Sequence, residues 1–225
     1  MTTIEVKHIT KSFSRTCILK DLSFSAEAGQ CIGILGENGS GKSTLFSVLI
    51  GLQKGEGAFL CDGKDLMKDT KNRRAKVGFV PQSPPLLSEL SARDNLRLWY
   101  TPAVMEQELE TGCLKMLGID EYIRVPVRHM SGGMKKRLAI GCAIAHKPSV
   151  LLLDEPTAAL DLLCKQKIYD YLQDFRRAGG LVVLATHDVF ELQLCDVIYL
   201  LKDGRLHRYE GDRTPNDLIE SLRHE

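Results

Sequence analysis

The sequence predicts an α/β fold in which helices cover both faces of a mainly parallel sheet. Three short apolar runs support this prediction: Cys31–Leu35, Val150–Leu153 and Leu181–Ala185. Continuous apolar runs of this length are typical of strands that are buried on both faces. Segments with helical periodicity separate the runs, and buried strands that alternate with helices favour a parallel sheet.

Apolar spacing and turn residues predict the remaining elements. Further strands are expected from Ile4 through Val6 to Ile9, over Ile18–Phe24 and over Val77–Val80, and a hairpin is expected where Val197–Leu201 and Arg205–Tyr209 flank Asp203-Gly204. Helical spacing is found at Leu45, Val48, Leu49 and Leu52, and over Asp94–Tyr100, Met105–Leu117, Met134–Ala145 and Leu163–Ala178. Because residues 86–145 are mostly helical, they predict an inserted helical subdomain.

The last residues predict a short terminal helix. Thr214 is a good helix cap, and Pro215 suits the first helical position. The helix would carry an apolar stripe of Leu218, Ile219 and Leu222. We expect the stripe to pack on the body of the protein, and binding to a partner is the alternative.

Composition narrows the class of protein. The 225 residues suit one large domain with a modest subdomain. The net charge of +1 gives no reason to expect a nucleic-acid or anionic-membrane partner. No apolar run approaches the roughly 20 residues that cross a bilayer, and the start lacks a signal-peptide pattern. These features predict a cytoplasmic protein whose membrane role would depend on a partner.

The seven cysteines do not predict a disulfide framework or a zinc site. Their number is odd, their spacing is wide and no C-x-x-C pair occurs. We expect most of them to be small core residues.

A glycine-rich segment after the first buried run predicts phosphate binding. Residues 36–44 read GENGSGKST and fit G-x-x-x-x-G-K-[ST], between an expected strand and an expected helix. The glycines let backbone N–H groups point inward at phosphate oxygens. Lys42 is expected to reach the β- and γ-phosphates, and Ser43 to bind Mg²⁺. The expected binding residues are Gly36, Asn38, Gly39, Ser40, Gly41, Lys42, Ser43 and Thr44.

A second motif places two carboxylates at the end of a buried strand. Val150–Leu153 is followed by Asp154, Glu155 and Pro156. Asp154 can hold the water shell of a metal ion, and Glu155 can polarise an attacking water. The alternative, a pair of acids that caps a helix or faces solvent, is weakened by the phosphate-binding segment.

A third motif points to a family. His129-Met130 is followed by Ser131-Gly132-Gly133, and residues 134–138 read MKKRL. Here the sequence resembles the ABC ATPase family, whose signature is L-S-G-G-[Q/M], with Met130 in place of the usual leucine. The two glycines and the serine open a helix with outward N–H groups. The resemblance implies that Ser131, Gly132 and Gly133 contact the γ-phosphate held by an opposite subunit.

Four further residues match the family pattern. The resemblance implies that Phe13 stacks on adenine, where tyrosine is common, and that Gln82 contacts the metal and links the site to the helical subdomain. It also implies that Asp161 lies in a loop between subunits and that His187 contacts the γ-phosphate and orders the water. The chain departs from the family just after Asp161, where Leu162 and Cys164 replace a frequent proline and arginine.

The resemblance covers nearly the whole chain and implies its organisation. A P-loop NTPase core with a RecA-like, mainly parallel sheet and an antiparallel β edge subdomain is expected over residues 1–85 and 146–225. The helical subdomain, with the signature, is expected over residues 86–145. Together they would form a single ABC ATPase domain.

The resemblance also implies a function. ATP and Mg²⁺ would bind between two subunits in a head-to-tail dimer, formed with a second copy or a related chain. Hydrolysis would drive a separate membrane permease, which would hold the chain at the inner face of the cell membrane. The permease would dock near Gln82 and Leu86, Leu87 and Leu90, although these leucines also fit a buried turn.

Export is the favoured direction of transport. The run SGGMKKRL resembles ATPases of small drug-, haem- or polysaccharide-exporting permeases, and no added C-terminal regulatory domain, which many sugar importers carry, is expected. One alternative is a soluble ABC ATPase that acts on nucleic acid or ribosomes. Such proteins usually have two nucleotide domains, a long coiled coil or a zinc element. A scaffold without turnover is another, against which Glu155 and His187 count.

Overall fold

The predicted parallel sheet is present. The computed structural model describes residues 2–223, without the side chains of Val189, Pro215, Ile219, Leu222 and Arg223. In its six-stranded sheet the strand order is β10-β9-β3-β8-β7-β6. All neighbours pair in parallel except β10 with β9. The strands are β3 (Cys31–Leu35), β6 (Val77–Val80), β7 (Val150–Asp154), β8 (Leu181–Thr186), β9 (Val197–Lys202) and β10 (Arg205–Tyr209).

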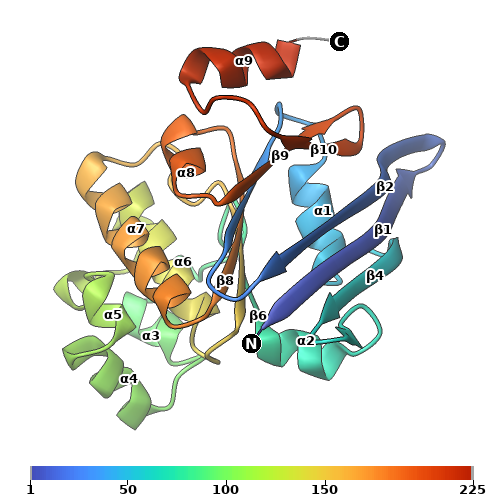
Figure 1. The fold of residues 1–225 in the computed structure, drawn as a ribbon. Coiled ribbons are helices and arrows are strands. Elements are labelled where there is room, and N and C mark those ends of the chain that lie inside the picture. Colours follow the sequence, from blue (N-terminus) through green and yellow to red (C-terminus); the bar gives the residue numbers. More distant parts are fainter. Residues whose placement is uncertain (1, 224–225) are drawn as a thin grey trace.

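A second, antiparallel sheet lies beside the first (Figure 1). Its order is β2-β1-β4-β5, and its strands are β1 (Thr3–Phe13), β2 (Thr16–Glu27), β4 (Glu56–Cys61) and β5 (Lys64–Asp65). The first two extend the strands that periodicity predicts. No bounds were predicted for β4 and β5, because Glu56-Gly57 interrupts the apolar pattern and β5 has only two residues.

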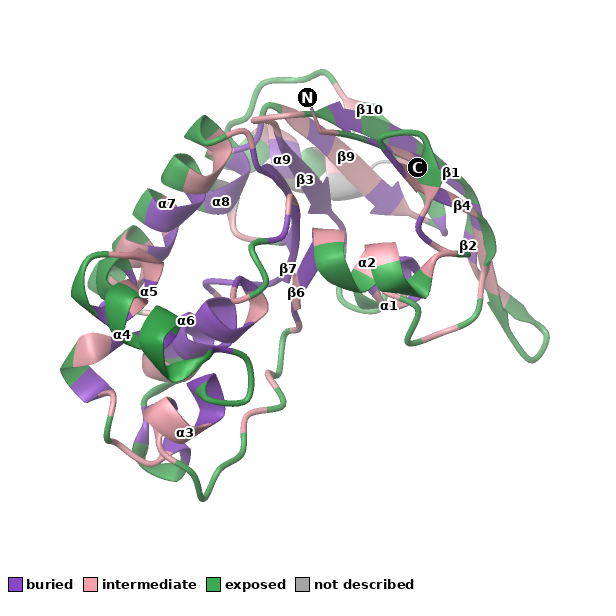
Figure 2. Ribbon diagram, turned by 90° about the horizontal axis from the view of Figure 1, so that it is seen from below, coloured by how far each residue is buried: buried purple, intermediate pink, exposed green. Residues whose placement is uncertain are grey.

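Each face of the six-stranded sheet carries its own hydrophobic core. Alternate residues of β7 and β8 face opposite sides: Leu151 and Leu153 belong to one core, and Val150 and Leu152 to the other. The helix α1 (Lys42–Leu49) packs in the core shared with the antiparallel sheet. Burial of the central strands on both faces (Figure 2) explains why their sequences are apolar throughout.

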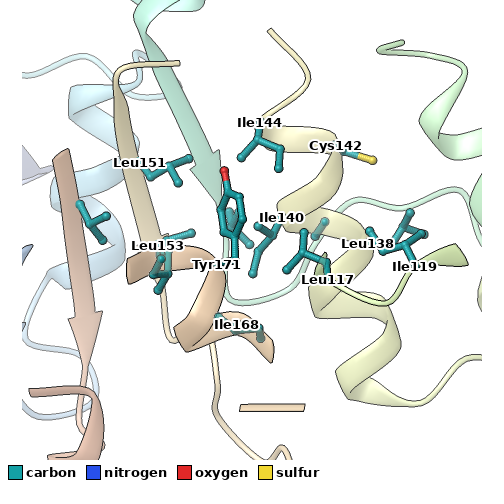
Figure 3. Packing of buried hydrophobic residues seen from close by; sticks show 14 of the residues in the cluster. Leu117, Ile119, Leu138, Ile140, Cys142, Ile144, Leu151, Leu153, Ile168 and Tyr171 are labelled. Carbon is teal, nitrogen blue, oxygen red and sulfur yellow. The ribbon is translucent and has the colours of Figure 1, made fainter. Parts of the chain in front are cut away.

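The opposite core joins the sheet to the predicted helical segments. The helices α6 (Gly132–Ala143), α7 (Leu162–Arg177) and α8 (Val189–Gln193) lie on this side (Figure 1). Figure 3 shows Leu151 and Leu153 of β7 facing Ile140 of α6 and Ile168 and Tyr171 of α7. These contacts pack α6 and α7 against β7.

Several predicted helix boundaries were wrong. The helix expected over Met105–Leu117 is two, α4 (Pro102–Glu110) and α5 (Cys113–Met116), because the chain turns at Gly112 and the Glu108 carboxylate accepts from the Cys113 N–H at 2.8 Å. A capping box of Ser91 and Asp94 starts α3 (Ala92–Leu96) two residues earlier than expected, and α3 ends four residues earlier. The short helix α2 (Thr70–Lys76) was not predicted.

Other helix ends also correct the sequence-based expectations. Leu52 does not continue α1, because α1 ends at Leu49 and Gly51 has a φ of 75°. Leu52 is 74% exposed. The terminal helix α9 (Pro215–Arg223) is present, and Leu218 is buried as expected, whereas the Ile219 and Leu222 side chains lie outside the described residues. In the described part of the chain, no helix combines the length and apolar character needed to span a membrane.

Candidate nucleotide site

The loop between β3 and α1 has the backbone that phosphate binding requires. Gly39 and Gly41 have φ values of 84° and 109°, which favour glycine. A Cβ at Gly36 would lie 2.6 Å from Ser40 Oγ and 2.8 Å from the Leu201 carbonyl oxygen. Gly41 precedes α1 without a side-chain cap, so the first N–H groups of the helix remain available to a ligand.

Lys42 places a buried positive charge inside this loop. Its side chain is only 6% exposed, and Nζ donates to the carbonyl oxygens of Gly36 at 2.6 Å and Glu37 at 3.0 Å. Burial lowers the pKa of Lys42, while the nearby Glu155 and Asp154 carboxylates act in the opposite direction. An ammonium with only carbonyl partners is well suited to meet incoming phosphate.

Asp154 and Ser43 bring two oxygen ligands together. The Asp154 carboxyl at the end of β7 is buried and accepts a hydrogen bond from the Ser43 side chain. Burial raises the pKa of Asp154, and the Ser43 hydrogen bond opposes this shift. No cluster of three His, Cys, Asp or Glu side chains suited to a metal occurs among residues 2–223. A carboxylate beside a hydroxyl is a donor set that fits Mg²⁺, which commonly takes one or two protein oxygens and completes its shell with phosphate and water.

Glu155 and His187 form a hydrogen-bonded pair across neighbouring strands. Glu155 follows β7 in the left-handed region, with a φ of 49°, and its N–H donates to the Ala185 carbonyl oxygen at 2.8 Å. This strained turn directs the buried carboxylate at His187, whose Nδ1 lies 2.8 Å from Glu155 Oε1. The imidazole itself is largely exposed. The arrangement joins a base to an orienting group that solvent can reach.

A cavity of about 390 Å³ brings eight of the predicted residues into one site. Its lining comprises Asn38, Gly39, Gly41, Lys42, Ser43, Thr44, Gln82 and Glu155. Gln82 follows β6, which β8 and β7 separate from β3, so the sheet itself gathers these residues at its carboxyl edge. This is the edge where open α/β sheets bind ligands.

Nine predicted residues are not part of this lining. Four of them adjoin lining residues in sequence or by contact: Gly36, Ser40, Asp154 and His187. The other five are Phe13, Ser131, Gly132, Gly133 and Asp161. Phe13, at the end of β1, is 44% exposed, with Lys11 Nζ 4.6 Å from its ring centre. Ser131 caps α6, accepting the Met134 N–H at 3.2 Å, and Gly132 and Gly133 begin that helix. Asp161 caps α7 and accepts the Cys164 N–H at 2.9 Å. Within one chain, neither the signature residues nor Asp161 line the phosphate cavity.

Three buried charged residues, Lys136, Arg137 and Glu191, had no role predicted from the sequence, and of these Lys136 and Glu191 bond to segments of the site. Lys136 Nζ in α6 donates to the carbonyl oxygens of Pro81 at 3.2 Å, Gln82 at 3.0 Å and Asp154 at 3.5 Å. Glu191 in α8 accepts from the Thr157 N–H and hydroxyl at 3.0 and 2.6 Å. The only signal for Lys136 was its place three residues after Gly133, and Glu191 had none.

The fold and the loop define a P-loop NTPase. The family model described as "ABC transporter" matches residues 19–158, so the chain belongs to the ABC transporter family and is one of its ATP-binding cassette ATPases. The chain is 34% identical over 208 residues to the Nod factor export ATP-binding protein I of Sinorhizobium fredii, covering 90% of this chain and 61% of that protein. It is 32% identical to the linearmycin resistance ATP-binding protein of Bacillus subtilis, covering 90% and 67%.

Solved structures agree with this assignment. The ATP-binding subunit of an ABC transporter superposes with a TM-score of 0.87 at 26% identity, covering 98% of this chain and 99% of that one. A dimeric ATP-binding cassette in a post-hydrolysis state with ADP and Pi superposes with a TM-score of 0.81 at 30% identity, covering 93% and 100%.

Proposed function

We propose that this chain binds and hydrolyses MgATP at the cavity around Lys42 and thereby drives a separate membrane-spanning permease. The observation that carries the proposal is the Glu155–His187 pair, 2.8 Å apart, beside a loop built for phosphate. Phosphoryl transfer to water needs positioning and charge stabilisation more than covalent chemistry. The cavity brings together groups that can position the reactants and groups that can stabilise their charge.

Each residue has a role that its position supports. The N–H groups of residues 36–44 and the Lys42 ammonium would hold the phosphates, and Thr44 would add a donor near the α-phosphate. Glu155 would accept the proton of the attacking water, and His187 would orient that water and contact the γ-phosphate. Mg²⁺, when bound, would neutralise phosphate charge, with Ser43, Gln82 and Asp154 as the residues that hold it.

The complete site is proposed to need two subunits. Ser131, Gly132, Gly133 and Asp161 lie outside the cavity of their own chain, which supports a role at the ATP of a partner in a head-to-tail dimer. The dimeric cassette at 30% identity supports this arrangement. ATP would bridge the two halves through its γ-phosphate, and hydrolysis would remove the bridge.

The permease is proposed to dock beyond Gln82 in the helical segment. Leu87 and Leu90 are exposed, as are Leu98 and Trp99, whereas Leu86 is partly buried against the core. The exposed side chains support docking, and only Leu86 fits the alternative of a buried turn. The proposed location is the cytoplasmic face of the membrane, where the permease would hold the chain.

Export remains the favoured direction. Among relatives at similar identity are proteins named for Nod factor export, linearmycin resistance and lantibiotic transport, although one at 35% identity is an energy-coupling factor transporter protein of Methanocaldococcus jannaschii. The alternative function on nucleic acid or ribosomes has no supporting feature in the chain, whose net charge is +1.

Replacing Glu155 with Gln tests the proposed function. We expect turnover to fall at least about 100-fold, because the amide cannot accept the proton of water. ATP binding should persist, and the unhydrolysed nucleotide should trap a dimer visible by sedimentation velocity. Lys42→Ala is the matched control, which should lose ATP binding itself. Unchanged phosphate release by Glu155→Gln would refute the assignment of the base.

A further inference from the structure

Three large apolar side chains are exposed at the beginnings of two neighbouring helices. Leu162 and Leu163 in the first turn of α7 are 83% and 79% exposed, and Phe190 in the first turn of α8 is 69% exposed. Exposed apolar patches on a protein surface commonly mark interaction sites. We call Leu162, Leu163 and Phe190 the apolar seam.

The two helix starts are fastened to each other. Lys165 Nζ of α7 lies 2.5 Å from Asp188 Oδ2, which caps α8. Lys165 stands three residues after Leu162, so both lie on the same side of α7. Glu191 adds a second link through Thr157, four residues before Asp161. The parts of the seam therefore hold a defined position relative to one another.

The seam lies among the residues that the proposed dimer would use. Asp161 directly precedes Leu162, and His187 stands three residues before Phe190. On the other side, a Cβ at Gly133 would lie 2.6 Å from Cys164 Sγ, so the signature turn packs directly against the first turn of α7. Any surface that meets Ser131 and Asp161 is adjacent to the seam.

We propose that the apolar seam is covered by a second copy of this chain in the ATP-bound dimer, where its burial stabilises the closed state. The proposal rests on the proposed function, because ATP brings the two copies together. A two-fold axis would bury the seam twice per dimer. Apolar burial would therefore supplement the γ-phosphate bridge in this chain, in place of the proline and arginine that often follow the family's aspartate.

Leucine-to-serine substitutions in the Glu155→Gln protein test the seam. Leu162→Ser and Leu163→Ser should each raise the concentration needed for half-maximal dimerisation with MgATP by at least about tenfold, because the lost apolar burial counts in both copies. Phe190→Ser should do the same. Leu52→Ser, at a position that is 74% exposed beyond the end of α1, is the matched control and should dimerise like the parent. Sedimentation velocity gives these concentrations.

Two further measurements separate apolar burial from damage to the site. At protein concentrations where both are monomeric, each seam variant should bind a fluorescent ATP analogue with the affinity of the parent. The tenfold difference should persist between about 0.1 and 0.5 M salt, because apolar contacts are not screened. Leu162→Met and Leu163→Met, which keep an apolar side chain, should retain dimerisation.

The outcomes distinguish the seam from the proposed function. If the Glu155→Gln protein binds ATP and the serine variants dimerise as well as Leu52→Ser does, the seam proposal is wrong and the proposed function stands. Monomers that bind ATP but dimerise only with a different subunit would contradict the assignment to a second copy. A parent that fails to bind ATP would overturn both.

Discussion

At the residue scale, the two buried lysines of the site bond to backbone carbonyl groups. Lys42 and Lys136 are each 6% exposed, and both donate to carbonyl oxygens, of the phosphate loop and of the strand ends respectively. Burying an unpaired ammonium is unfavourable, and burial accordingly lowers the pKa of both lysines. The burial of Lys42 and Lys136 is therefore explained by the segments that they hold in place, the phosphate loop for Lys42 and the strand ends for Lys136.

Lys136 is expected to position the Gln82 segment relative to the signature helix. Lys136→Met removes a side-chain donor that Pro81, Gln82 and Asp154 share. We predict a loss of about 1–3 kcal/mol in the free energy of unfolding, because buried carbonyl groups lose a partner. Turnover should fall more than ATP affinity. Urea unfolding measures the loss of stability, and steady-state kinetics measure turnover, with Lys135→Met as the control. Equal stability and equal turnover of the two variants would contradict the prediction.

Because the Glu191 carboxyl is buried, we predict that the free energy of unfolding depends on pH. Burial raises the pKa of Glu191, against the hydrogen bonds from Thr157. In the window above the unfolded-state pKa, the native carboxyl keeps a proton that the unfolded chain has released, so this group's contribution to stability falls as the pH rises. Glu191→Gln should remove this fall. Urea unfolding at pH 5 and pH 8 should show the variant gaining on the wild type at pH 8; an equal difference at both pH values would contradict the prediction.

At the element scale, local backbone rules placed the hairpin correctly and the helical segment only approximately. Asp203 and Gly204 have φ values of 50° and 76°, as the two-residue turn between β9 and β10 requires. The helix break at Gly112 depends on Glu108 turning back to the Cys113 N–H, a contact that periodicity does not show. The residues of a turn determine its backbone conformation, whereas the length of a helix also depends on side chains that contact its ends.

Gly204 is expected to tolerate no side chain. A Cβ there would lie 2.5 Å from the Ile18 carbonyl oxygen, and the Gly204 carbonyl accepts from the Lys20 N–H at 2.7 Å, which ties the hairpin to β2. Gly204→Val should therefore lower the free energy of unfolding by about 2–4 kcal/mol. Asp203→Asn, which tolerates the same backbone region, should stay within about 0.5 kcal/mol of the wild type. Chemical denaturation compares the two, and a stable valine variant would argue against this packing.

At the scale of the whole molecule, the nucleotide site lies where the two cores meet at one edge of the sheet. The phosphate loop leads into α1, which packs in one core, and Lys136 belongs to α6, which packs in the other. Figure 1 shows these helices on opposite sides of the strands. A ligand at this edge therefore contacts segments that both cores hold.

Binding of ATP is expected to stabilise the entire fold. At a free concentration of about 100 times the Kd, the free energy of unfolding should rise by about 2.7 kcal/mol, because only the native state assembles the cavity. Urea unfolding of the Glu155→Gln protein with and without MgATP measures this rise at constant protein concentration. Lys42→Ala should show no rise, and stabilisation of that variant by ATP would place the binding site elsewhere.

Much of the site was predictable from the sequence because its parts are local motifs. Residues 36–44 and Asp154-Glu155 follow strands whose apolar runs identify them, and the structure places most of these residues around one cavity. The roles of Phe13 and of Ser131–Gly133 stay predictions. Lys136 and Glu191 were missed, because their partners lie 18 to 55 residues away.

The sequence by itself determined which strands are buried, where the phosphate loop lies and which acids end the strand beside it, because each depends on neighbouring residues. Only the tertiary structure decided that His187 meets Glu155, that Lys136 joins two strand ends, and that the signature turn packs on Cys164. The first two contacts follow from the order of the strands in the sheet, and the third from the packing of α6 against α7. That order depends on how the two cores pack, which no local pattern in the sequence specifies.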